Sequence, residues 1–217
     1  MIRTLRSALL LVVAVVAVGG CAGLSERVDR NALNAVPNEE LLVLFDAENG
    51  VYIARDESDL ASRTLQDAKL ALSRARAYRD VIAERRTTGA TIDSVAVLDL
   101  LAAWNDERIA MREAEVAWRE TELATSDTRL WAARARYERE KARLVKDKNP
   151  SAGTGIELAR FDEQVKHWAT REAEAEAEIA AKNAVVVEKR AKYFDLSRRL
   201  QEQSAGAYGG PWADLLD

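Results

Sequence analysis

The sequence contains almost no cysteine or histidine, the residues that form disulfides and bind zinc and other transition metals. Among its 217 residues there is one cysteine, Cys21, and one histidine, His167. A lone cysteine has no disulfide partner within the chain. One cysteine and one histidine cannot supply the ligands of a zinc or transition-metal site. We therefore expect neither an internal disulfide nor a bound metal or cofactor.

Motifs of catalysis are also missing. No nucleophile elbow or glycine-rich oxyanion loop accompanies His167. The stretch GTG at 153–155 lacks the rest of a phosphate-binding loop. Pairs of carboxylates are frequent, but on polar helices these are ordinary solvated charges. We expect a protein that is not an enzyme, with a hydrolase built around His167 as the remote alternative.

Residues that break helices are few, and patterns typical of strands do not occur. The chain has 3 prolines and 10 glycines, and they cluster. It is rich in alanine, glutamate, arginine and leucine, which favour helices. It has no alternating β-branched runs bounded by turn residues. The sequence therefore predicts an all-α fold.

The N-terminus combines a basic start with a short apolar run. Arg3 and Arg6 precede an uninterrupted apolar run of 11 residues, 8–18. A membrane-spanning helix needs about 20 residues, so this run is too short, and its length and basic flank are typical of a secretory signal. The run ends in the sequence Val18-Gly19-Gly20-Cys21.

This ending resembles the lipobox of bacterial lipoproteins, in which an aliphatic residue and two small residues precede a cysteine. The resemblance implies that Cys21 receives a diacylglyceryl group and that residues 1–20 are a signal peptide removed just before it. Ala22 stands where aspartate would favour the inner membrane, which implies the outer membrane, facing the periplasm, if the source is Gram-negative. The alternatives are a plain signal peptide with an incidental cysteine, or a short anchor that is not cleaved.

Net charge argues against binding to nucleic acid. The formal charge is −4 for the whole chain. Without residues 1–20 the formal charge is −6, because this segment contains Arg3 and Arg6 and no acidic residue. A nucleic-acid partner would require a basic surface.

Apolar residues repeat every seven positions over three long segments. We expect a lipidated N-terminus and flexible tether over 21–37, then one long-helix coiled-coil domain over 38–203. Its helices are predicted at about 38–86, 91–146 and 156–203, and 204–217 is predicted to be a flexible tail. In the first predicted helix the seven-residue spacing of apolar residues continues without a shift across Asn49-Gly50, which favours one continuous helix at this point. The rows are Ala47, Ala54, Ala61, Ala68, Ala75 and Ile82 in the first helix; Val95, Ala102, Ile109, Val116, Leu123, Leu130, Tyr137 and Leu144 in the second; and Leu158, Val165, Glu172, Ile179, Val186, Tyr193 and Leu200 in the third.

Short connections between helices of similar length favour antiparallel neighbours, and a seven-residue period favours left-handed supercoiling. The sequence thus predicts an elongated antiparallel three-helix coiled-coil bundle. Antiparallel pairing would bring residues 74–79 near Asp99, Asp106 and Glu107, and residues 172–178 near Arg129 and Arg134. The tryptophans at 104, 118, 131 and 168 lie on or near the apolar rows. They are expected in the core rather than on a ligand platform.

Two exposed ends are candidate contact sites for a partner. The first is the turn at 85–92, with Arg85, Arg86, Thr87, Thr88 and Gly89. Residues 84–123 show a faint similarity to the helical hairpins of outer-membrane efflux proteins, although the chain lacks that family's barrel strands. The second is the tail, in which Trp212, Leu215 and Leu216 follow a Gly-Gly-Pro hinge; the alternative there is a frayed end.

Together these features predict a non-catalytic, lipid-anchored periplasmic scaffold or spacer of the bacterial cell envelope. Its partners would be the membrane, through the lipid on Cys21, and an envelope protein or a second copy of itself. The alternative is an accessory lipoprotein of a trans-envelope transport or secretion channel.

Overall fold

The computed structural model describes residues 23–88 and 94–209. Three long helices dominate this part of the chain: α3 (Phe45–Thr88), α4 (Val95–Lys148) and α6 (Leu158–Gln203). Shorter elements accompany them, namely α1 (Arg30–Leu33), α2 (Asn38–Leu41), the 3₁₀ helix η1 (Leu42–Leu44) and α5 (Pro150–Gly153). The described segments contain no strand, so the prediction of an all-helical fold with long, mutually packed helices is confirmed.

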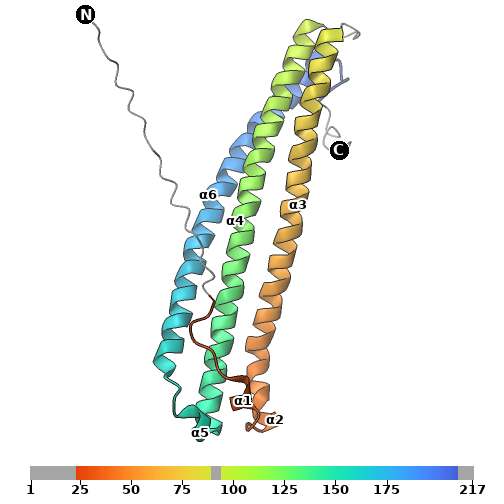
Figure 1. The fold of residues 1–217 in the computed structure, drawn as a ribbon. Helices are drawn as coiled ribbons and strands as arrows, with labels where there is room; N and C mark the ends of the chain where they lie inside the picture. The colour runs from red at the N-terminus through yellow and green to blue at the C-terminus, as the bar shows by residue number, and fades with distance from the viewer. Residues whose placement is uncertain (1–22, 89–93, 210–217) are drawn as a thin grey trace, which may run out of the picture.

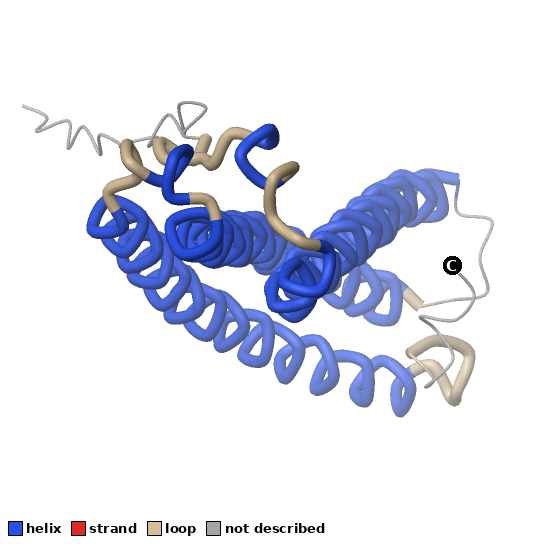
Figure 2. The backbone as a smooth tube through the Cα atoms, turned by 90° about the horizontal axis from the view of Figure 1, so that it is seen from below, coloured by secondary structure: helices blue, strands red, loops and turns tan. Residues whose placement is uncertain are grey.

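Helix α4 is the central helix of the molecule. It packs along α3 on one side and along α6 on the other, whereas α3 and α6 make few contacts with each other. Figure 1 shows the chain rising in α3, descending in α4 and rising again in α6. Seen from below, α4 lies between its two neighbours at the near end (Figure 2). An open side therefore remains between α3 and α6 over part of their length.

The predicted row of α3 from Ala54 and the second half of the predicted row of α6 face the interior. In α3 the alanines at 54, 61, 68 and 75 are buried together with Ile82. The helix also continues without a break through Asn49 and Gly50, as the phase of its row predicts. In α6 the buried residues Val186, Tyr193 and Leu200 belong to the predicted row. Small alanine side chains let α3 approach α4 closely.

In α4 the deepest row is not the one predicted to be the main row. Val97, Trp104 and Met111 are buried, whereas Val95 is 75% exposed and Leu123 is half-buried. The row that starts at Val97 continues with the buried residues Thr125 and Ala132. Because α4 has a neighbour on each of two sides, its apolar surface is broad, and seven-residue spacing alone does not identify its centre.

The long helices have defined ends. Ser94 caps α4 by accepting a hydrogen bond from the backbone N–H of Val97. Asn149 ends α4 and caps α5 by accepting from the N–H of Ala152, and Pro150 occupies the first turn of α5, where it needs no hydrogen-bond donor. The connection at 149–157 therefore contains a short helix rather than an irregular loop.

The segment at 23–37 is not the flexible tether that the sequence predicts. It lies along the lower half of the molecule in Figure 1, against α4 and α6. Val28 and Val36 are buried, at 9% and 5% exposure. Val28 packs with Ala142, Val145 and Phe161. Isolated apolar residues thus hold the segment in place, and they do so without any periodic pattern.

The start of the predicted flexible tail is likewise folded back. After Ser204, residues 205, 206 and 209 adopt positive φ angles and turn the chain. The hydroxyl of Ser197 then donates a hydrogen bond of 2.8 Å to the carbonyl of Gly209. A side chain at 209 would come within 2.4 Å of the Ser197 carbonyl oxygen, so this close approach requires glycine.

None of the helices that the structure describes is both long and apolar enough to span a membrane.

Candidate functional site

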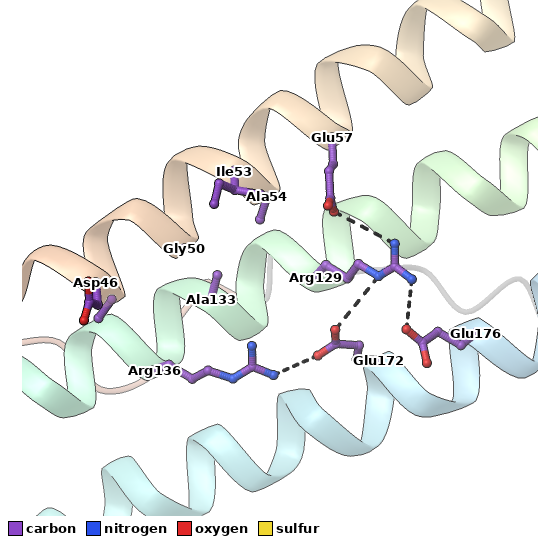
Figure 3. Close-up of a pocket in the computed structure, with 11 residues that line it drawn as sticks. Asp46, Gly50, Ile53, Ala54, Glu57, Arg129, Ala133, Arg136, Glu172 and Glu176 are labelled. Carbon is purple, nitrogen blue, oxygen red and sulfur yellow. Dashed lines mark hydrogen bonds and ion pairs between the residues drawn. The ribbon is translucent and has the colours of Figure 1, made fainter.

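A groove lies between α3 and α6, with α4 as its floor. It has a volume of about 570 Å³, and Figure 3 shows the residues that line it. From α3 come Asp46, Ala47, Gly50, Ile53, Ala54 and Glu57, from α4 Arg129, Ala133 and Arg136, and from α6 Glu172 and Glu176. Small residues of α3 and α4, namely Ala47, Gly50, Ala54 and Ala133, leave room for the groove.

Arg129 crosses this groove and connects all three long helices. Its Nη2 donates a 2.9 Å hydrogen bond to Glu176 on α6. Its guanidinium also lies 3.9 Å from a carboxylate oxygen of Glu57 on α3 and 3.9 Å from one of Glu172 on α6. Arg136 adds a 3.0 Å ion pair with Glu172. One arginine on the central helix therefore holds acidic side chains of both flanking helices (Figure 3).

The electrostatics of this cluster favour a structural role. The hydrogen bond to Glu176 is the main cause that raises the pKa of Arg129, so its guanidinium stays protonated. A permanent cation is a poor proton donor or acceptor. In the described segments, no three histidine, cysteine or acidic side chains come together in a way that could hold a metal ion. The groove can bridge helices, but its residues offer no nucleophile with an adjacent base.

Ion pairs of the predicted kind connect the helices, although several partners differ. Arg129 pairs with Glu172 and Glu176, as predicted. Arg134 instead lies over the ring of Trp131, at 4.8 Å. Between α3 and α4, the predicted pair of Arg79 with Asp106 forms at 2.9 Å. Asp99 pairs with Arg86 rather than with a residue of 74–79, and Glu107 lies near Lys189 of α6.

The described start of the chain is held by a buried amide. Gln164 on α6 is 7% exposed. Its Oε1 accepts hydrogen bonds from the Ser25 hydroxyl at 3.0 Å and from the Glu26 N–H at 2.9 Å, and its Nε2 donates to the Glu26 carbonyl at 3.2 Å. Next to it, the N–H of Val28 donates to Glu138 on α4 at 2.9 Å. Two helices thus fix the backbone a few residues after the predicted lipidation site.

His167 and its surroundings can be compared with the hydrolase alternative. The imidazole is exposed on α6 and lies edge-on to Trp168, with ring centroids 5.5 Å apart. Ser25 lines the same shallow groove, but its hydroxyl donates to Gln164 and not to the histidine. The arrangement does not place a serine nucleophile in hydrogen-bond contact with His167.

The tryptophans have different environments. Trp104 and Trp168 are buried, at 3% and 9% exposure, whereas Trp118 and Trp131 are half-buried. Trp131 stacks on Trp168 with a centroid distance of 5.9 Å. Trp104 packs against Tyr193 of α6, and Trp131 and Trp168 join α4 to α6, in agreement with the core interpretation for these rings.

The predicted tip residues are already engaged within the chain. Arg85 donates a 3.0 Å hydrogen bond to the Tyr208 hydroxyl, and Arg86 forms its ion pair with Asp99. Thr87 and Thr88 are exposed, and their hydroxyls both donate to the carbonyl of Glu84. Gly89, Trp212, Leu215, Leu216 and the lipidation candidate Cys21 lie outside the described residues.

The two features that the sequence did not suggest are the Gln164 hydrogen bonds and the Arg85–Tyr208 contact. Both join segments more than 100 residues apart, and no local pattern indicates such pairs.

Comparisons of the chain with models of protein families, with curated proteins and with solved structures found no match.

Proposed function

We propose that this protein is a non-catalytic helical scaffold or spacer of the bacterial cell envelope, anchored by lipid on Cys21. In a Gram-negative source it would be attached to the outer membrane and face the periplasm. The proposal starts from the lipobox-like sequence that ends at Cys21 and uses the structure to describe what the anchor would hold.

The observation that carries the proposal is the packing of the segment after the anchor. Residues from Gly23 onward lie against α4 and α6. The hydroxyl of Ser25 and the backbone N–H groups of Glu26 and Val28 donate hydrogen bonds to side chains of those helices. Two residues of chain span at most about 7 Å. A lipid on Cys21 would therefore hold the helical body close to the membrane, which suits a protein whose function depends on its position.

We further infer that the three long helices form an elongated antiparallel coiled-coil bundle. The seven-residue rows of α3 and α6 and the central place of α4 support this. Helix α4 has 54 residues, which at about 1.5 Å per residue gives a length near 80 Å. Such a body could separate or connect components of the envelope over that distance.

The charged groove supports a structural rather than a catalytic role. Arg129 and Arg136 form ion pairs with glutamates of α6. A cluster of this kind selects the register of three helices, even though each exposed pair contributes only about 0–1 kcal/mol.

A second candidate is an accessory lipoprotein of a trans-envelope channel that contacts its partner through the tip at 85–92. Val95 is 75% exposed at the same end as the exposed residues Thr87 and Thr88. An apolar side chain at the tip of a helical hairpin favours contact with another protein. In-cell photocrosslinking from position 87 tests this candidate: adducts with a channel protein support it, and their absence excludes the tip as the contact.

The anchor is tested by membrane fractionation of the full chain and two variants in a bacterial host. We expect the unchanged protein in the outer-membrane fraction. Cys21→Ser should leave uncleaved or mislocalised precursor, because the residue that would be acylated is gone. Ala22→Asp is the matched variant, which keeps Cys21 and should shift the protein to the inner membrane. Unchanged processing and membrane association of Cys21→Ser would refute the proposal.

A further inference from the structure

The outer face of α3 carries exposed apolar residues that the bundle does not use. Leu60 is 61% exposed and Leu70 is 51% exposed. At 3.6 residues per turn, Leu60 lies about 100° around the helix axis from the buried residue Ala61, and Leu70 lies about 160° from the buried residue Ala68. Helix α6 makes few contacts with α3.

Four charged residues accompany the two leucines on this face. They are Asp56, Arg63, Asp67 and Arg74, and all four are exposed. In the part of the chain that the structure describes, none of them has an ion pair or a side-chain hydrogen bond, in contrast to the paired charges on the α4 side of the helix. With the leucines they occupy an arc of about 80°. We call this set the α3 outer stripe.

The order of residues in the α3 outer stripe is self-complementary. Read in chain order it is Asp, Leu, Arg, Asp, Leu, Arg, with successive spacings of 4, 3, 4, 3 and 4 residues. The spacings are the same in both directions. When the stripe is reversed, each acid meets a base and each leucine meets a leucine. The facing pairs are 56 with 74, 60 with 70, and 63 with 67, each formed twice.

We propose that a second copy of this chain packs antiparallel on the α3 outer stripe and forms a two-fold symmetric dimer. Next to the two-fold axis of the dimer, Arg63 of each protomer pairs with Asp67 of its partner. Leu60 packs on Leu70 on either side, and Asp56 pairs with Arg74 at the ends. A symmetric dimer uses the same surface twice, and that use requires the self-complementary order found here.

The neighbouring residues fit the same pairing. Continuing outward, the exposed residue Ile53 would lie opposite Ala77, and the exposed residue Val81 opposite Asn49. None of these pairs brings two like charges together. From 56 to 74 the contact is about 27 Å long, so it is short for a stable interface. Anchoring both copies to one membrane would favour the dimer by raising the effective concentration of the chain. Only this effect of the membrane rests on the proposed function; the pairing of the two stripes does not.

Site-directed crosslinking tests the pairing directly. The full chain is purified in a Cys21→Ser background, so that the introduced cysteines are the only thiols, and is treated with a short bismaleimide. The variant with both Leu60→Cys and Leu70→Cys should give crosslinked dimer. Either substitution alone should give none, because like positions in the two copies lie about 15 Å apart along the helix axis. Dimer from a single variant, or none from the double variant, would overturn the proposal.

A charge exchange at the two-fold axis provides an independent test by analytical ultracentrifugation. Arg63→Asp and Asp67→Arg should each weaken dimerisation by about tenfold or more, because each creates two like-charge contacts. The two substitutions together should restore it. Arg190→Asp and Glu178→Arg change exposed charges of α6 and should leave the dimer unaffected. Failure of the double variant to recover would contradict the antiparallel pairing, whatever Cys21→Ser does to membrane anchoring.

Discussion

Gln164 is a buried amide whose three hydrogen bonds all go to one short segment of chain. A buried amide is stable only when its polar atoms find partners. Here the partners are Ser25 and Glu26, so the position of the N-terminal segment and the burial of Gln164 depend on each other. A substitution of Gln164 therefore tests directly how the N-terminal segment is held against the helices.

Gln164→Leu should lower the free energy of unfolding by about 1–3 kcal/mol, because the hydrogen-bonding groups of Ser25 and Glu26 lose their partner. It should also speed proteolysis near residue 25 before global unfolding. Urea denaturation and limited proteolysis measure the two effects. Gln203→Leu is the control, since Gln203 is exposed on the same helix. If both variants behave alike, the segment is not held by Gln164.

Asp195 gives a residue-scale prediction for pH dependence. The hydrogen bond from Arg198 is the main cause that lowers the pKa of Asp195 below its ordinary value of 3.8. A carboxyl with a lowered pKa stabilises the fold above its unfolded pKa, and this contribution is lost as the pH falls through the folded pKa. Asp195→Asn should therefore lower the melting temperature slightly at pH 7, and this effect should disappear once the pH has fallen below the folded pKa of Asp195.

The comparison for Asp195 is Asp80→Asn, which alters an exposed aspartate of α3 that has no ion pair in the described part of the chain. A difference between wild type and Asp195→Asn that persists unchanged into acid would show that the effect does not come from the carboxylate charge.

At the scale of elements, the contact between α3 and α4 depends on small side chains. Ala75 is fully buried, and its carbonyl accepts a 3.1 Å hydrogen bond from the side-chain amide of the buried residue Asn105. The two helices therefore approach closely at this level. A larger side chain at 75 would have to push α3 away from α4 or adopt a strained rotamer.

Ala75→Leu should destabilise the protein by about 1–3 kcal/mol through overpacking, measured by chemical denaturation followed by circular dichroism. Ala83→Leu introduces the same side chain eight residues along the same helix at an exposed position, and it should change stability little. Equal effects of the two variants would mean that the alanine row does not set the distance between the helices.

The same elements explain what the sequence could and could not predict. In α3 the predicted row of Ala54 is buried, together with Leu65 and Leu72 of a second row. In α6 the predicted row is buried only from Val186 onward, and Phe161, Gln164 and Trp168 are the buried residues of its first half, where the N-terminal segment also covers the helix. In α4, two neighbours bury two sides of one helix, so the row of Val97 lies deeper than the row of Leu123. A seven-residue pattern therefore predicts which residues are buried more reliably for a helix with one neighbour than for a helix with two.

The segment at 23–37 shows a different limit. Helix α1 has only four residues, and the apolar residues Val28, Leu33 and Val36 that pack here follow no helical or strand period. Their burial is fixed by surfaces of α4 and α6 more than 100 residues further along the chain. The ion pairs of Arg129 with Glu172 and Glu176 were predictable because a hairpin fixes which residues face each other; the hydrogen bonds of Gln164 were not.

At the scale of the whole molecule, the proposed anchor lies next to a body of three long helices. The apolar rows are used within the bundle, and the charges along its seams pair between helices. The described start of the chain packs on the same body, one residue after Ala22. A lipid on Cys21 would consequently position the whole bundle, and the α3 outer stripe would remain free to meet a second copy in the same membrane.

The central claim is that the mature protein begins at Cys21 and carries lipid there. The most direct measurement is the intact mass of the full-length gene product, extracted with detergent from the membranes of a bacterial host. The account predicts a chain of residues 21–217 whose mass exceeds that of the polypeptide by a diacylglyceryl group and an amide-linked acyl chain. A mass equal to the uncleaved 217-residue polypeptide, or to an unmodified chain cut elsewhere, would contradict it.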